Sequence, residues 1–313
     1  MKTVSFREGY YAQEGGGEAD DHGFWAHASA RIVVSPHAVD KPPKGGKTMN
    51  SEEMKALSDR IYQDLRLKTL PVAVSFHQEE PQWPEKTRRP SQALNKRITL
   101  CQAMTLARTY RWTVGLTAED IVCVPALIAF GHARNKDAHQ LLCSFFARVG
   151  WSRDEETAAG EVSGMTFMPK GWASAMVFSP LAKGVVDPDT VVFYGNPAQM
   201  MRLVHAWTYM TGQRVQSGFS GKIECREYLA APCLSDQANV VVPGNGDRIM
   251  SGTQDEEMIF AVPGDKLQLL DTGLEKAGRA LGAKYPVPFY QNFQPEFPGV
   301  FKELAEEAGL DIG

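Results

Sequence analysis

Cysteine is the residue type in this chain with the clearest capacity for chemistry. The 313 residues contain five cysteines, which are Cys101, Cys123, Cys143, Cys225 and Cys233. An odd number spread over a long chain is not typical of a disulfide framework, so we expect reduced thiols or metal ligands. Cys143 lies in the apolar run QLLCSFFARV and is expected in the core. The other four are candidate ligands of an iron–sulfur cluster or of zinc, because thiolates bind both.

Two other interpretations of these cysteines stay open. The sequence contains no C-x-x-C pair, and a free cysteine often packs in a core as a small hydrophobic residue. A nucleophilic cysteine is the second alternative, although no histidine lies near any of the four in the sequence. An enzyme would use Cys123 or Cys225 as metal ligand or thiolate, with Arg248 holding an anionic substrate. The residues do not decide between an enzyme and a binding protein.

Four polar residues are candidates for binding a ligand. Gln102 and Gln199 lie near the starts of two expected helices, where an amide either bonds to the backbone or faces a ligand. Asp247 and Arg248 follow a Pro-Gly-Asn-Gly turn in VVVPGNGDRIM, whose backbone N–H groups could hold an anion. The alternative is a tight hairpin-like turn in which Arg248 pairs with the acidic residues 255–257, since no complete phosphate-binding motif is present.

The elements that must position these residues begin near residue 49. Residues 1–48 show no sustained helical or strand period, and we expect a loosely structured N-terminal extension. Ser51 can cap a helix whose apolar residues recur at steps of three and four from Met54 to Leu65. Residues 49–313 are therefore expected to form a single domain.

Two segments of this domain resemble each other, at roughly residues 70–150 and 175–270. CQAMTLARTY in the first segment matches AQMMRLVHAW in the second, and each expected helix is preceded by a strand, LPVAVSF or DTVVFYG. In the first segment a polar, proline-rich loop (residues 77–92) lies between the strand and the helix. In the second, Asn196 and Pro197 are suited to begin the helix.

The segments that follow the two helices also match. DIVCVPALIA and GKIECREYLA, each read as a short strand, share an isoleucine two places before the cysteine and a leucine four places after it. We therefore predict an α+β fold with two fused, related α/β repeats, arranged by a pseudo-twofold axis around a central sheet. The alternative is two unrelated amphipathic helices.

Composition excludes several kinds of partner. A net charge of −4 and a pI near 6.0 provide no basic field for nucleic acid. No stretch approaches the roughly 18 consecutive apolar residues of a membrane span, and no secretory signal opens the chain. We therefore expect a cytoplasmic protein with no membrane partner, and its oligomeric state stays open.

The order of several short motifs resembles a known family. The runs LPVAVSF, CQAMTLAR, VCVPALIAFG, FSPL, YGNPAQMMRLVHAW, GKIECRE, NVVVPGNGDRI and DEEMIFAVP look like the family called domain of unknown function 169. The resemblance covers roughly residues 52–290, and it implies kinship of fold but no reaction. Members of that family often carry a cysteine where this chain has Pro243 or Gly244, so a site that used that cysteine would be altered here.

These observations lead to two hypotheses of function. The first is a protein that binds a small ligand, or a metal or iron–sulfur cofactor, at the junction of the two repeats, where a cleft can be lined from both halves. The second is a non-catalytic sensor or accessory protein-interaction module whose cysteines are buried and structural.

Overall fold

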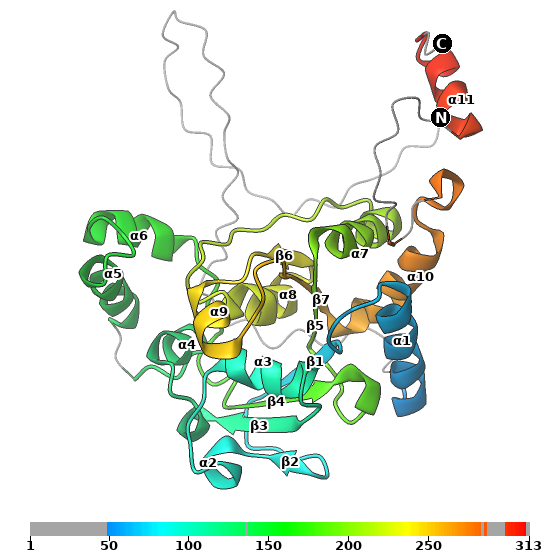
Figure 1. Cartoon of the computed structure of the whole chain (residues 1–313). Coiled ribbons are helices and arrows are strands. Elements are labelled where there is room, and N and C mark those ends of the chain that lie inside the picture. The colour runs from blue at the N-terminus through cyan, green and yellow to red at the C-terminus, as the bar shows by residue number, and fades with distance from the viewer. Residues whose placement is uncertain (1–48, 135–136, 283–284, 287–297, 311–313) are drawn as a thin grey trace, which may run out of the picture. The chain divides into compact units, whose positions relative to one another are not determined.

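The computed structural model describes residues 49–134, 137–282, 285–286 and 298–310 (Figure 1). The extension expected at residues 1–48 lies outside this part of the chain. The longer helices are α1 (Ser51–Asp64), α3 (Leu100–Arg108), α5 (Ala138–Arg148), α6 (Glu155–Ser163), α7 (Pro197–Thr211), α10 (Leu267–Lys276) and α11 (Gly299–Glu307). The shorter ones are α2 (Pro90–Ala93), α4 (Val124–Ala129), α8 (Ala231–Ser235) and α9 (Asn245–Ser251).

One mixed sheet of seven strands organises the described residues. Its strands are β1 (Val72–His77), β2 (Thr87–Arg88), β3 (Thr113–Thr117), β4 (Ala175–Pro180), β5 (Thr190–Gly195), β6 (Asn239–Val241) and β7 (Met258–Pro263). Their order is β2-β3-β4-β1-β5-β7-β6, and every neighbouring pair is antiparallel except β2 with β3. The α+β class expected from the sequence is confirmed.

Alternation of side chains along the strands separates two cores. In β5, Val192 and Tyr194 belong to one hydrophobic cluster, whereas Val191 and Phe193 belong to the other. Because successive side chains of a strand point to opposite faces, the two clusters lie on opposite faces of the sheet. The first face is covered by residues of α3, α4, α8 and the π-helix next to α8 (Arg226–Ala230). The second face is covered by residues of α1, α7 and α10 (Figure 1).

Capping boxes begin three of the main helices. Asn50 caps α1, so the cap lies one residue before the predicted Ser51. Thr99 caps α3 together with Gln102, and Asn196 caps α7 together with Gln199, as the sequence pattern predicted for Asn196. Such caps satisfy backbone N–H groups that a first helical turn leaves without partners.

The two-repeat arrangement is not confirmed. Helix α3 packs on one face of the sheet and α7 on the other, so the two helices do not share a common side. A strand, β3, follows α3, whereas residues 213–222 after α7 contain none. The face of the sheet on which a helix packs depends on contacts with distant segments, so a resemblance between two short helical sequences does not predict it.

Three local predictions need correction. The turn PGNGDR begins helix α9 rather than closing a hairpin, because Asp247 accepts the Gly244 N–H and completes a cap. DIVCV forms only an isolated bridge between Ile121 and Ile98, and GKIEC is not a strand. The polar loop 77–92 contains β2 and part of α2. No helix in the described ranges is long and apolar enough to cross a membrane.

Candidate functional site

Three of the four candidate cysteines meet on the α3 face of the sheet. Cys101 lies in the first turn of α3, Cys123 is the residue just before α4, and Cys225 immediately precedes the π-helix. Burial raises the pKa of Cys225 well above its ordinary value, and the nearby Cys123, Asp247 and Cys101 raise it further. Since each group lies within electrostatic reach of Cys225, we call these four residues the thiol centre.

The thiols of this centre are protonated near neutral pH. Burial, together with Asp247 and Cys123, raises the pKa of Cys101 to about 12. Burial also raises the pKa of Cys123. Because the thiolate is the nucleophilic form, this environment does not favour a free nucleophilic cysteine. Cys101 and Cys123 are half-buried, whereas Cys225 is buried.

Polar contacts orient two of the sulfurs. Cys101 Sγ lies 2.9 Å from Thr99 Oγ1 and 3.6 Å from the carbonyl oxygen of Gly246, which joins α3 to α9. Cys225 Sγ lies 3.8 Å from the Ile223 carbonyl oxygen. Two segments distant in the sequence are therefore held at one place by contacts that involve the sulfur of Cys101.

Asp247 provides a carboxyl group inside the thiol centre. It is buried, and its oxygens accept hydrogen bonds from Tyr228 Oη at 2.9 Å and from the Gly244 N–H at 3.1 Å. Burial raises the pKa of Asp247 despite these bonds. Tyr194 and Tyr228 are also buried there, and burial raises their pKa values well above the ordinary value. A polar interior thus adjoins the sulfurs.

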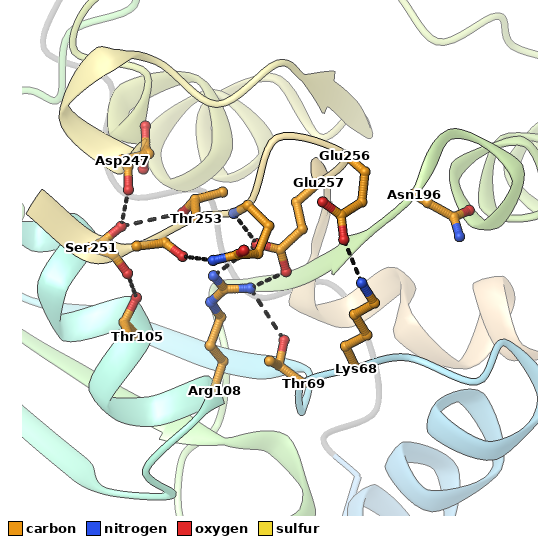
Figure 2. A network of polar contacts seen from close by, with 12 residues as sticks. Lys68, Thr69, Thr105, Arg108, Asn196, Asp247, Ser251, Thr253, Glu256 and Glu257 are labelled. Atoms are coloured by element: carbon orange, nitrogen blue, oxygen red, sulfur yellow. Dashed lines mark hydrogen bonds and ion pairs between the residues drawn. The ribbon is translucent and has the colours of Figure 1, made fainter. Parts of the chain in front are cut away.

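A second network continues from Asp247 to a buried ion pair. Ser251 Oγ donates to the Asp247 carbonyl oxygen at 2.5 Å, and Thr105 Oγ1 donates to the Ser251 carbonyl oxygen at 2.9 Å. Arg108 then donates to both oxygens of Glu257, at 2.6 and 3.0 Å. Figure 2 shows this pair at the middle of the network, between Asp247 with Ser251 and an outer pair of Lys68 with Glu256.

The segment ECREY, residues 224–228, adds buried charges beside Cys225. All five residues are buried, and Arg226 forms an ion pair with Glu227. Glu224 Oε1 accepts the N–H groups of Ser220 and Lys222 at 2.8 and 3.0 Å, and burial raises the pKa of Glu224. The π-helix begins within this segment, and such helices are frequent at functional sites.

Sequence analysis missed these charges, together with Tyr194 and the Arg108–Glu257 pair. A signal for the segment was present, because five ionisable residues there precede the apolar run LAAP without the alternation of a half-buried strand. No sequence pattern indicated that Arg108 would form a buried ion pair, because its partner Glu257 lies 149 residues further along the chain.

The structure gives other predicted residues local partners. Gln102 and Gln199 each accept the N–H of their capping residue, at 2.9 and 2.7 Å, so the backbone-bonding alternative accounts for both side-chain oxygens. Arg248 donates to the Gln254 carbonyl oxygen and contacts Asp255, one of the acidic residues proposed as its partners. Ligand binding by Gln102, Gln199, Asp247 and Arg248 stays a prediction.

The two remaining cysteines lie in different surroundings. Cys143 is buried in the cluster of α5 and α6, which confirms its expected place in a core. Cys233 lies on α8, where it is half-buried and packs against the same hydrophobic cluster as Cys225.

The thiol centre fits a soft metal by its donor chemistry, but its side chains are not assembled around one point. Sulfur ligands select soft or borderline metals such as zinc and iron in clusters. Across the described ranges, however, no three His, Cys, Asp or Glu side chains are placed to hold a metal ion together. Metal binding would require Cys101 and Cys225 to turn from the carbonyl groups that they contact.

A pocket of about 400 Å³ lies among α1, α7 and α10. Its lining residues are Asp64, Leu65, Arg202, Leu274, Glu275, Ala277, Arg279, Gly282 and Tyr285, none of which belongs to the thiol centre. Arg202 donates to the carbonyl oxygens of Leu274 and Ala277 at the end of α10, so its charge has a structural role there.

Comparisons with known proteins agree with the resemblance seen in the sequence. The DUF169 family model, described as "Uncharacterised ArCR", matches residues 60–271. The uncharacterized protein MJ0308 of Methanocaldococcus jannaschii is 27% identical over 228 residues, which cover 72% of this chain and 96% of that protein. No solved structure matches the chain.

Proposed function

The chain belongs to the DUF169 family, whose description names no activity, and we therefore propose a function from the thiol centre. The protein binds a thiophilic metal cofactor, zinc or an iron–sulfur cluster, through Cys101, Cys123 and Cys225. The single observation that supports this proposal is that three cysteines from distant segments lie on one face of the sheet, where Cys123 and Cys101 are near enough to Cys225 to raise its pKa. A cytoplasmic location belongs to the same proposal, since a reducing compartment keeps thiols available.

The chemistry of the centre supports a metal rather than a covalent role. A thiol with a raised pKa is a poor free nucleophile, but its thiolate is a strongly basic donor once a metal displaces the proton. Cys101 and Cys123 are half-buried, so both thiols are partly accessible to an ion, whereas Cys225 is buried. The polar interior around Asp247 and Tyr228 can compensate the charge that a bound metal introduces.

Metal analysis of protein prepared without oxygen tests the proposal. The full chain, produced with iron and zinc supplied, is expected to retain metal, and an iron–sulfur cluster would absorb near about 400 nm. Cys123→Ser and Cys225→Ser are expected to lose the metal. Cys143→Ala is the matched control, because this cysteine lies in a separate core and its loss leaves the thiol centre intact. Metal-free protein under these conditions contradicts the proposal.

The second candidate is a non-catalytic sensor or accessory module with structural cysteines. It is favoured by Cys225, which is 8% exposed and packs within a hydrophobic cluster. On this hypothesis, Cys225→Ala lowers the free energy of unfolding through a small cavity, and no variant changes metal content. Colourless, metal-free protein with that pattern supports the second candidate.

A further inference from the structure

The pocket among α1, α7 and α10 carries charged groups at two depths, and we call it the α1–α10 pocket. Leu65, Arg202 and Ala277 are buried and form its floor. Asp64 and Glu275 are exposed and lie at its rim. The pocket shares no lining residue with the thiol centre, so a ligand bound there is independent of the proposed metal cofactor.

Arg202 is a buried cation whose partners are uncharged. The residue is 5% exposed, and among the described residues no carboxylate forms an ion pair with it. Its Nη1 atom donates to the Ala277 carbonyl oxygen at 3.1 Å, and its Nη2 atom donates to the Leu274 carbonyl oxygen at 3.0 Å. Burial lowers the pKa of Arg202, as expected for a cation without a nearby counter-charge. Buried charges are normally paired, so this guanidinium is suited to an anionic ligand.

The end of α10 fixes this guanidinium and leaves donors for a ligand. A guanidinium has five N–H donors, and the two carbonyl oxygens accept from only two of those of Arg202. The other three have no hydrogen-bond partner within the described part of the chain. Because the group is already held in place, it loses little freedom when it binds, and its planar fork matches the two oxygens of a carboxylate. Arg279, exposed at the same pocket, adds a second positive charge.

The acidic residues at the rim are unfavourable for the helices that carry them. Asp64 is the last residue of α1, and Glu275 lies in the last turn of α10. A negative charge at a helix C-terminus opposes the helix dipole, and neither carboxylate has an ion-pair partner in the described ranges. Arg60 lies near both, but its own ion pair is with Asp271 at 2.6 Å. Helix stability therefore does not explain the two acids, whereas both would attract an ammonium group in the pocket.

We propose that the α1–α10 pocket binds a small zwitterion, an α-amino acid or a similar molecule with one carboxylate and one ammonium group. The carboxylate binds the buried guanidinium of Arg202, and the ammonium group lies at the rim with Asp64 and Glu275. Leu65 and Leu274 provide apolar surface for the rest of the molecule. A volume of about 400 Å³ is at the small end of the range for ligand pockets, which suits a compact metabolite.

Titration of the full chain with amino acids and their derivatives tests the pocket. Each common amino acid is first added singly, and binding is detected as an increase in melting temperature. The strongest binder is then compared by calorimetry with its N-acetyl derivative, which lacks the ammonium group, and with its amide, which lacks the carboxylate. The amide is expected to bind about tenfold more weakly or worse, because it loses the charge-assisted bonds to the buried arginine. The N-acetyl derivative is also expected to bind more weakly than the amino acid.

Variants at the floor and at the rim identify the binding groups. Arg202→Lys keeps a positive charge at the end of α10 but loses the planar fork, so it is expected to weaken binding about tenfold or more. Asp64→Asn and Glu275→Gln are each expected to weaken binding about twofold to fivefold, the effect of losing one exposed charge pair. Glu156→Gln, which removes an exposed carboxylate on α6 outside the pocket, is the matched control and is expected to bind like the native protein.

Either of two results would overturn the proposal. The first is that no amino acid raises the melting temperature of the native protein at millimolar concentration. The second is that the N-acetyl derivative or the amide binds as tightly as the amino acid, or that Arg202→Lys, Asp64→Asn and Glu275→Gln all bind it like the native protein. If Arg202→Lys does not fold, the two rim variants decide, because Asp64 and Glu275 are exposed and their replacement leaves the core unchanged.

Discussion

At the scale of single residues, the Arg108–Glu257 pair shows what a buried charge requires. Both side chains are almost fully buried, at 3% and 5% exposure, and the guanidinium also lies 3.9 Å from the centroid of the Tyr194 ring. The N–H of Gln254 donates to Glu257 Oε2 at 2.8 Å. The pair therefore joins α3 to the loop before β7, next to the network that begins at Asp247.

Removal of one partner from this pair should destabilise the protein strongly. Glu257→Gln leaves the Arg108 charge buried without its counter-ion, which costs about 3–5 kcal/mol. Replacement of both residues by methionine removes both charges, so the double variant is expected to recover much of that loss. Urea unfolding of the native, single and double variants measures both effects. A double variant no more stable than Glu257→Gln would show that the residues act separately.

Cys101 should make the stability of the metal-free protein depend on alkaline pH. Burial is the main cause that raises its pKa from 9.0 to about 12 in the folded chain, and proximity to Asp247 is the next. Below pH 9 both the folded and the unfolded chain keep the proton, so this stabilising contribution is fully present. As the pH rises from 9 to 12, only the unfolded chain loses the proton, and stability falls by up to about 1.4 kcal/mol per pH unit.

Comparison with Cys101→Ala isolates this effect from the titration of lysines and tyrosines. The free energy of unfolding is measured for both proteins at several pH values between 8 and 11. The advantage of the native protein over the variant is expected to shrink as the pH increases. A constant difference over that range would mean that the thiol titrates normally in the folded protein.

At the scale of elements, close contact between α7 and α10 depends on Gly273. A Cβ atom at this position would lie 2.3 Å from the Ala206 carbonyl oxygen, and that backbone atom cannot move without its helix. Gly160 in α6 offers the opposite situation, since no heavy atom lies within 4 Å of its added Cβ. The two glycines therefore separate helix packing from helix propensity.

Alanine at the two positions should have effects of opposite sign. Gly160→Ala is expected to stabilise the protein by about 0.5–1 kcal/mol, because alanine is the better helix former. Gly273→Ala gains the same propensity but forces two helices apart, and overpacking of this kind costs about 1–3 kcal/mol or more. Thermal and urea unfolding measure both. Stabilisation by Gly273→Ala would mean that α7 and α10 are not in close contact.

At the scale of the whole molecule, the described fold begins at Met49. Met49 packs against the hydrophobic cluster of α1, α7 and α10, and Asn50 caps α1 with its own side chain. A chain that begins at Met49 should therefore keep its melting temperature within a few degrees of the full-length value. A large decrease would show that residues 1–48, which lie outside the described part, contribute to folding.

Local chemistry was enough to predict several elements from the sequence. Asn196 and Pro197 mark the start of α7, and the β-branched run before them forms β5. Helix α1 likewise follows from its apolar repeat and a cap within one residue of the prediction. Such elements depend on interactions within about four residues, which a sequence displays directly. The core position of Cys143 follows from its apolar neighbours for the same reason.

Only the tertiary structure decided which distant residues meet. Cys101 and Cys225 come together because α3 and the π-helix cover the same face of the sheet, and the sheet order that produces this is absent from any local pattern. The similar helices α3 and α7 separate to opposite faces because each buries its apolar side against different strands. Arg108 pairs with Glu257 through the same kind of long-range contact. Sequence determined where the cysteines stand along the chain, whereas packing determined which of them lie near one another, because packing is set by contacts between segments far apart in the chain.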